Sequence, residues 1–156
     1  MNTTEATELF SHLPLFKGLT PAHIARIADL ASEESHAEGA TLFKESEAGE
    51  KFYIVVDGAV RISRQLSGMG EEALAVLRAG EYFGEMALVD DSPRSADAIA
   101  HEPTRVLVIR KSDFEDLLFV DRALAYDLLW KFVRTLSSRL RASNDKMAML
   151  AVTARF

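Results

Sequence analysis

The apolar residues in the middle of the chain come in short runs that glycine and aspartate interrupt. Most of these runs are rich in β-branched residues, which favour strands over helices. We predict strands over 40–43, 51–56, 59–66, 73–78, 95–100 and 104–110. Asp57-Gly58 predicts a tight hairpin, because a type I′ turn needs positive φ, and Gly68-Met69-Gly70 predicts a looser hairpin tip. Several short strands at close spacing predict a β-sandwich or barrel.

Helical periodicity replaces this pattern toward both ends of the chain. Thr20 is the expected N-cap of a helix that begins at Pro21, and an apolar elbow over 13–19 precedes it. At the other end, Ser112-Asp113-Phe114-Glu115 predicts a capping box that opens a helix. We expect Asp121 to cap a second, longer helix that runs to about Val152.

One face of this longer helix carries a regular apolar stripe, which we call the seam. Its positions alternate spacings of four and three: Leu129, Val133, Leu136, Leu140, Ser143, Met147 and Leu150. A stripe of about three heptads predicts a coiled coil, here with a second copy of the chain. The alternative is a helix packed on its own domain, but a helix this long cannot lie wholly on a small barrel.

Composition and charge narrow the function classes. The chain has 156 residues, 48% hydrophobic and 27% charged, which suits one soluble globular domain. It has no cysteine, which excludes disulfides, thiol catalysis and Cys-ligated metals. Neither a secretory signal nor a membrane span is evident, so we expect a cytoplasmic protein without a membrane partner. The net charge of −6 argues against nucleic acid as a partner, since phosphate backbones are bound mainly through basic faces.

The segment from Gly84 to Ala96 carries the most specific chemistry. A short helix starting near Gly84 would present free backbone N–H groups to an anion. Arg94 offers a planar charged fork that suits two phosphate oxygens, and Ser95 adds a hydroxyl. Small Ala96 lets the backbone approach a ligand, and Glu85 can accept from the vicinal hydroxyl of a ribose. Together these residues suit one sugar and one phosphate.

This segment resembles the phosphate-binding cassette of the cyclic nucleotide-binding domain family, whose pattern runs F-G-E-x-A-L, a few turn residues, then P-R-x-A. Here the pattern stands as Phe83-Gly84-Glu85-Met86-Ala87-Leu88 and Pro93-Arg94-Ser95-Ala96, and we call residues 83–96 the cassette. The stretch 48–60 is similar to the family's second signature and precedes the cassette in the right order. The chain departs from the family at Ser46-Glu47, where Gly-Asp is common.

The resemblance implies an α+β, mainly β fold: a jelly-roll β-barrel with N-terminal helices and a long C-terminal helix. We expect an N-terminal helical segment over 1–38, the barrel with the cassette over 39–111, and C-terminal helices with the dimerisation helix over 112–156. The implied ligand is a cyclic nucleotide. Its expected binding residues in the cassette are Gly84, Glu85, Met86, Ala87, Arg94, Ser95 and Ala96.

The resemblance also suggests which residues recognise the base of the cyclic nucleotide. In catabolite-activator-like regulators the long dimer helix places two adjacent polar side chains over the adenine, and alignment puts Ser143 and Asn144 at those positions. Adenine has a donor that a serine hydroxyl or an asparagine carbonyl can accept. Members selective for cGMP often carry threonine after the cassette arginine, where this chain has Ser95, so cAMP is expected and cGMP is not excluded. The alternative for Ser143 is a small residue that fixes the register of the helix.

The expected function is that of a homodimeric regulatory sensor, not an enzyme, whose C-terminal helices move on ligand binding and signal to a protein partner. The family's transcription factors continue into a helix-turn-helix, but only six residues follow Leu150, too few for that motif.

Two alternatives belong to other function classes. A cupin-type metal enzyme would need converging histidines, whereas His12, His23, His36 and His101 stand singly. A domain of this fold that has lost its ligand would act as a protein-interaction module. The presence of the ligand chemistry at Glu85 and Arg94 argues against that alternative, because a buried arginine without a phosphate is costly.

Overall fold

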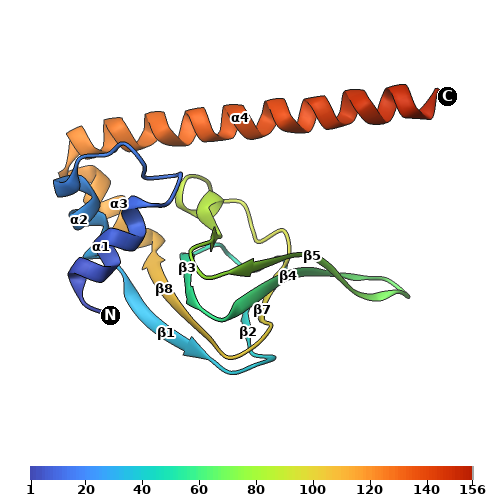
Figure 1. Ribbon diagram of the computed structural model, residues 1–156, viewed down its shortest axis with the longest axis horizontal. Coiled ribbons are helices and arrows are strands. Elements are labelled where there is room, and N and C mark those ends of the chain that lie inside the picture. The colour runs from blue at the N-terminus through green and yellow to red at the C-terminus, as the bar shows by residue number, and fades with distance from the viewer. Residues whose placement is uncertain (156) are drawn as a thin grey trace.

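Within residues 1–155, which the computed structural model describes, eight strands form two antiparallel sheets (Figure 1). The first sheet has the order β1 (Ser32–His36), β8 (Thr104–Arg110), β3 (Lys51–Asp57) and β6 (Tyr82–Phe83). The second has the order β2 (Thr41–Phe43), β7 (Asp97–Ala100), β4 (Ala59–Leu66) and β5 (Gly70–Arg78). Alternate side chains of both sheets meet in one apolar layer: Tyr53, Val55, Val60, Phe83, Ala98, Val106 and Val108. The mainly β fold expected from the sequence is confirmed.

The helices gather at one end of the two sheets (Figure 1). They are α1 (Thr3–Ser11), α2 (Pro21–Ala28), α3 (Lys111–Val120) and α4 (Arg122–Ala154), and a single 3₁₀ turn, η1 (Glu85–Leu88), lies within the cassette. The elbow over 13–19 packs beneath α4, and its apolar side chains are buried with those of α1, α2, α3, the first half of α4 and the first sheet. The largest fully buried members of this second core are Phe10, Phe16, Phe52 and Phe114. The helical end is therefore a packed layer on the first sheet.

Two predicted helix caps are confirmed. The Thr20 hydroxyl accepts the His23 N–H at 3.2 Å, and the Asp121 carboxylate accepts the Leu124 N–H at 3.0 Å. The second bond, supported by Arg26, holds the pKa of Asp121 below its ordinary value. Both caps satisfy N–H groups that a helix cannot pair internally.

Three local predictions are wrong. The segment expected to be helical before residue 39 contains β1, which pairs with β8, so the sheets begin at Ser32. Strands β3 and β4 do not form a hairpin: they belong to different sheets, and Gly58, with φ +92°, turns the chain from one to the other. The capping box predicted at Ser112 does not form, because α3 begins at Lys111 with Arg110 at its N-cap, which places Ser112 inside the first turn. The hairpin at Gly68-Met69-Gly70 is confirmed by the pairing of β4 with β5.

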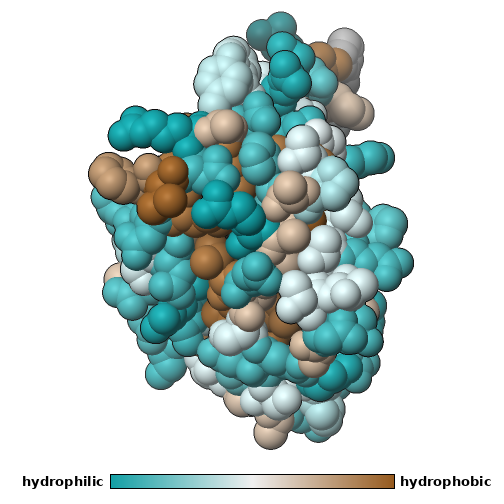
Figure 2. Space-filling view, turned by 90° about the vertical axis from the view of Figure 1, so that its left-hand side faces the viewer, coloured by the Kyte–Doolittle hydropathy of each residue, from teal (hydrophilic) through white to brown (hydrophobic). Residues whose placement is uncertain are grey.

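Helix α4 packs on its own domain only over its first half. Its buried residues, Leu124, Leu128 and Phe132, recur every four positions and face the domain. From Ser138 to Arg155 every residue is exposed, and this half of the helix runs to about the level of the far tip of the β4–β5 hairpin (Figure 1). Figure 2 looks onto the helical end, where hydrophobic side chains lie between hydrophilic ones. The seam residues Leu140, Met147 and Leu150 are each more than 60% exposed.

Candidate functional site

A cavity of about 270 Å³ opens between the cassette and the second sheet. This is slightly below the usual range for small-molecule pockets, about 300–1,000 Å³. Its walls are the cassette, from Phe83 to Ala87 and from Ser92 to Ala96, with Asp90, and the side chains of Phe43 and Ile62. The cavity thus has one polar wall from the cassette and one apolar wall from the sheet.

Arg94 is the one buried charged side chain of the described core, with 8% of its surface exposed. Its Nη2 donates to the Lys51 carbonyl at 2.6 Å, and its guanidinium carbon lies 4.0 Å from the centre of the Phe43 ring. Its buried Nε has no acceptor, and no carboxylate among residues 1–155 forms an ion pair with it. Burial lowers the pKa of Arg94, while nearby Tyr53 and Glu47 oppose that shift. The cavity therefore holds a permanent positive charge without a matching anion.

Two glycines permit close packing in and around the cassette, and Gly84 makes room for the Arg94 guanidinium. Gly84 has φ +78°, and a Cβ there would lie 2.8 Å from Arg94 Nη1 and 3.1 Å from the Lys51 carbonyl oxygen. A Cβ on Gly49 would lie 2.8 Å from the Cβ of Ala87. The glycine that opens the cassette is thus required both by its backbone conformation and by the close approach of Arg94.

The backbone of Arg94 is held by the loop at Ser46-Glu47. The Ser46 N–H donates to the Arg94 carbonyl, and the Arg94 N–H donates to the Glu47 carbonyl, both at 2.8 Å. Ser46 has φ +75°, a left-handed conformation that glycine adopts most easily. Ser46 stands where the family often has glycine, and its backbone still adopts the left-handed conformation that glycine favours.

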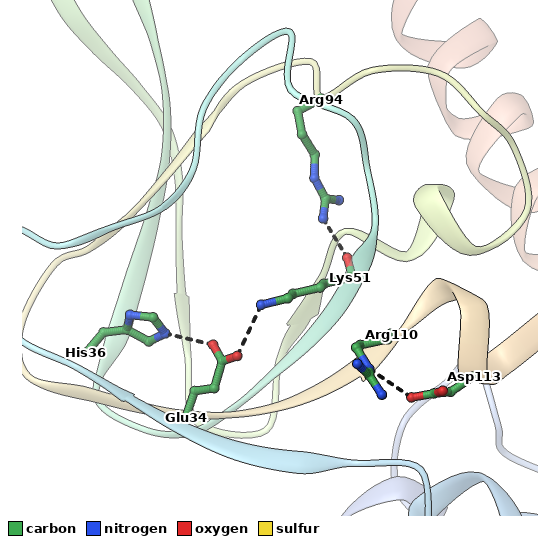
Figure 3. Close-up of polar contacts among 6 residues, drawn as sticks. All are labelled: Glu34, His36, Lys51, Arg94, Arg110 and Asp113. Atoms are coloured by element: carbon green, nitrogen blue, oxygen red, sulfur yellow. Dashed lines mark hydrogen bonds and ion pairs between the residues drawn. The ribbon is translucent and has the colours of Figure 1, made fainter.

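Lys51 of β3 connects the cassette to β1, on the other side of β8 in the same sheet (Figure 3). While its carbonyl accepts from Arg94, its Nζ donates to Glu34 at 3.2 Å, and the other Glu34 oxygen lies 3.2 Å from His36 Nε2. Glu34 is thus engaged by Lys51 and His36 and is not available to neutralise Arg94.

Two cations tie the cassette to the C-terminal helices. Lys111, at the start of α3, donates through Nζ to the Asp90 carbonyl at 2.6 Å and to the Asp91 carboxylate at 2.7 Å. Arg139 of α4 donates to the Glu85 carboxylate and, at 3.1 Å, to the Tyr82 hydroxyl. The carboxylate expected to accept from a ribose is therefore in contact with α4.

The structure brings the cassette residues of the predicted site together and leaves the two helix residues apart. Gly84 to Ala87 and Arg94 to Ala96 all line the cavity. Ser143 and Asn144 are exposed on α4 and do not line it in the single chain. Sequence analysis missed Phe43 as a wall of the cavity and Arg139 as the partner of Glu85. The place of Arg139, one helical turn before Ser143, was the available signal for its contact.

The cyclic nucleotide-binding domain profile matches residues 33–121 of this chain, which include the whole cassette. The chain belongs to this family. It is 33% identical over 138 residues to the cyclic AMP receptor protein of Thermus thermophilus; the match covers 88% of this chain and 62% of that protein. It is 33% identical over 111 residues to a cAMP-dependent protein kinase regulatory subunit of Colletotrichum orbiculare, covering 71% of this chain and 28% of that protein. The chain thus spans less than two thirds of either relative.

Solved structures agree with this membership. The N-terminal domain of a transcriptional regulator from Streptomyces coelicolor superposes with a TM-score of 0.78 at 33% identity, over 89% of this chain and 94% of that one. The catabolite activator protein of Thermus thermophilus superposes with a TM-score of 0.75 at 32% identity, over 89% and 63% of the two chains. Among residues 1–155, no helix is both long enough and apolar enough to pass through a membrane.

Proposed function

We propose that this chain is a cytoplasmic cyclic nucleotide sensor that binds cAMP in preference to cGMP. The observation that carries the proposal is Arg94, a buried cation beside a cavity, which has one neutral acceptor and, among residues 1–155, no carboxylate partner. An uncompensated buried charge destabilises a fold by several kcal/mol unless an anion accompanies it. A cyclic phosphate in the cavity would supply that anion.

The ribose and the base of a cyclic nucleotide also have suitable groups around this cavity. The Glu85 carboxylate has two oxygens, one of which accepts from Arg139, so the other can accept from a ribose hydroxyl. The Phe43 and Ile62 side chains give the cavity an apolar wall beyond the cassette. Ser143 and Asn144 would read the base only if α4 shifts toward the cavity or a second chain supplies them.

The seam is the proposed dimer interface. Its residues Leu140, Met147 and Leu150 are 62%, 67% and 68% exposed, and they lie beyond the part of α4 that packs on the domain. A parallel coiled coil between two copies of α4 would bury them. In such a dimer, ligand binding at the cassette would act on α3 through Lys111 and on α4 through Arg139, which would reposition the helices.

Calorimetric titration of the purified chain with cAMP, cGMP and 5′-AMP tests the proposal. We expect saturable binding of both cyclic nucleotides, with cAMP the tighter. We expect weaker binding of 5′-AMP, which has the same base and sugar but an open, more highly charged phosphate. If neither cyclic nucleotide binds, the chain is instead a domain of this fold that acts through protein contacts alone.

A further inference from the structure

A second concave surface lies between the elbow and α4, outside the cavity of the cassette. This groove has a volume of about 640 Å³. Four of its nine lining residues are cations and none is acidic: Lys17, Lys131, Arg134 and Arg139. On a chain with a formal net charge of −6, this is a local reversal of charge.

Most of these cations have no anionic partner. Among residues 1–155, Arg139 is the one groove cation that forms an ion pair, with Glu85; Lys17, Lys131 and Arg134 form none. Lys131 Nζ lies against the backbone of Gly18, where an added Cβ would come within 2.6 Å of it. Like charges that share one groove repel one another, and an anion of several charges would relieve the repulsion of all of them.

Hydroxyl groups complete the lining. Thr135 and Ser138 border the groove from α4, and the Tyr82 hydroxyl borders it from β6. Tyr82 accepts from Arg139 at 3.1 Å, and burial raises its pKa above its ordinary value, so the hydroxyl keeps its proton and can donate it. Ammonium, guanidinium and hydroxyl donors around one groove are the set that binds phosphate oxygens.

The groove faces away from the seam. At about 100° per residue, Lys131 and Ser138 stand about 200° around the helix from the seam positions Leu129 and Leu136. A dimer formed through the seam would therefore leave Lys131 and Ser138 open to solvent, while Arg139, one residue before Leu140, would stand beside the seam.

We propose that the groove binds a clustered phosphate group, the di- or triphosphate of a small molecule, at a site separate from the cavity of the cassette. An acidic protein segment would be a different partner, and the titration with a glutamate-rich peptide below tests it. The proposal does not depend on which ligand the cassette binds.

The test is calorimetric titration of inorganic tripolyphosphate at fixed ionic strength, without divalent cations. The variant Lys131→Gln/Arg134→Gln removes two groove charges. The matched control, Arg141→Gln/Lys146→Gln, removes two charges from the same helix at residues that do not line the groove. We expect the groove variant to bind at least about tenfold more weakly and the control to bind within about twofold of the parent chain. Arg134→Gln alone should give an intermediate loss.

Several outcomes would overturn the proposal. If tripolyphosphate does not bind, the site does not exist. If both double variants lose the same affinity for tripolyphosphate, the anion is attracted by the overall positive charge of the helix and not by a defined site. Binding of orthophosphate as tight as that of tripolyphosphate contradicts a clustered-phosphate site, and tighter binding of a glutamate-rich peptide assigns the groove to an acidic protein segment. If saturating cAMP displaces tripolyphosphate, the tripolyphosphate lies in the cassette cavity and not in the groove.

The test also distinguishes this proposal from the proposed function. Unchanged cAMP binding in the groove variant shows that the two sites are separate. If the chain binds tripolyphosphate but no cyclic nucleotide, the proposed function is wrong and the groove proposal still holds.

Discussion

Arg139 of α4 forms an ion pair with Glu85 of the cassette, across 54 positions of sequence. The same guanidinium donates to the Tyr82 hydroxyl, and the contact with Glu85 raises the pKa of Arg139. Glu85 is 15% exposed and Arg139 47%, so the pair lies at the edge of the domain. Through this contact, α4 is joined to Glu85, one of the residues that line the cavity. Arg139 is therefore a positioning residue: it fixes the carboxylate while leaving one carboxylate oxygen for a ligand.

A double-mutant cycle measures this contact. We expect Glu85→Gln and Arg139→Gln to show a coupling of about 0.5–1 kcal/mol in the free energy of unfolding, since the arginine is half exposed and the pair is partly screened. Urea denaturation of the four chains gives the value. A second cycle that pairs Arg139→Gln with Glu72→Gln, an acidic residue of β5 with no contact to Arg139, should be additive. Additivity in the first cycle as well would show that the pair contributes nothing to holding α4.

Arg94→Ala should abolish most cyclic nucleotide binding. Each charge-assisted hydrogen bond to phosphate contributes about 1.5–3 kcal/mol, so losing a two-pronged contact weakens binding by about a hundredfold or more. The apo chain should stay folded, because the substitution removes a buried charge that has one neutral acceptor. Titration together with thermal unfolding measures both effects. Arg105→Ala, which changes an arginine that is 48% exposed, is the control and should bind normally. Unchanged affinity in folded Arg94→Ala would disprove the assignment of the cassette.

Ser46→Gly should stabilise the chain. A left-handed backbone costs a non-glycine residue about 1–2 kcal/mol, and the greater freedom of glycine in the unfolded chain offsets about 0.5–1 kcal/mol of that gain. The expected net increase in the free energy of unfolding is about 0.5–1 kcal/mol. Chemical denaturation measures it, and Ser46→Ala, which has the same backbone restriction, should give no increase. A loss of stability in Ser46→Gly would mean that the serine side chain makes a contact worth more than the strain.

The parts of this structure that the sequence predicted depend on residues close together in the chain. Thr20 and Asp121 cap helices by bonds to residues three positions away, and such bonds follow from residue type and spacing. Gly84 and Arg94 lie ten positions apart in one contiguous pattern, and the structure places them in contact. Local chemistry therefore predicted the cassette wall of the cavity.

The parts that were missed depend on contacts across long stretches of sequence. Strand β1 has no alternation of apolar residues; it is stabilised by pairing with β8, including the bond from Arg105 to Glu33 at 2.8 Å. At Gly58 the positive φ was predicted correctly and the pairing was not, because turn residues fix backbone angles and not which strands join. The contact of Arg139 with Glu85 joins residues 54 positions apart, and its one signal was the place of Arg139 one helical turn before Ser143.

Charged substitutions in the seam should separate the proposed dimer. Leu140→Lys/Met147→Lys places two charges on residues that the single domain leaves exposed, so the fold should persist while the coiled coil does not form. Sedimentation should give a dimer for the parent chain and a monomer for this variant. Met149→Lys, an equally exposed position off the seam, should remain dimeric. A parent chain that sediments as a monomer with and without cAMP would show that the seam is not an interface.

The remaining prediction concerns how the base is read. We expect cAMP to bind more tightly than cGMP by about 1–2 kcal/mol, the cost of one mismatched polar contact. If Ser143 and Asn144 contact the base, Ser143→Ala/Asn144→Ala should reduce this preference while leaving phosphate binding by Arg94 intact. Because both residues are exposed on α4 and lie outside the cavity of the single chain, the contact needs ligand-induced movement of α4 or a partner helix. The monomeric seam variant distinguishes these routes: loss of selectivity on dissociation assigns the contact to the partner helix, and retained selectivity assigns it to the same chain. Parent selectivity in the Ser143→Ala/Asn144→Ala variant would place base recognition elsewhere, in the wall formed by Phe43 and Ile62.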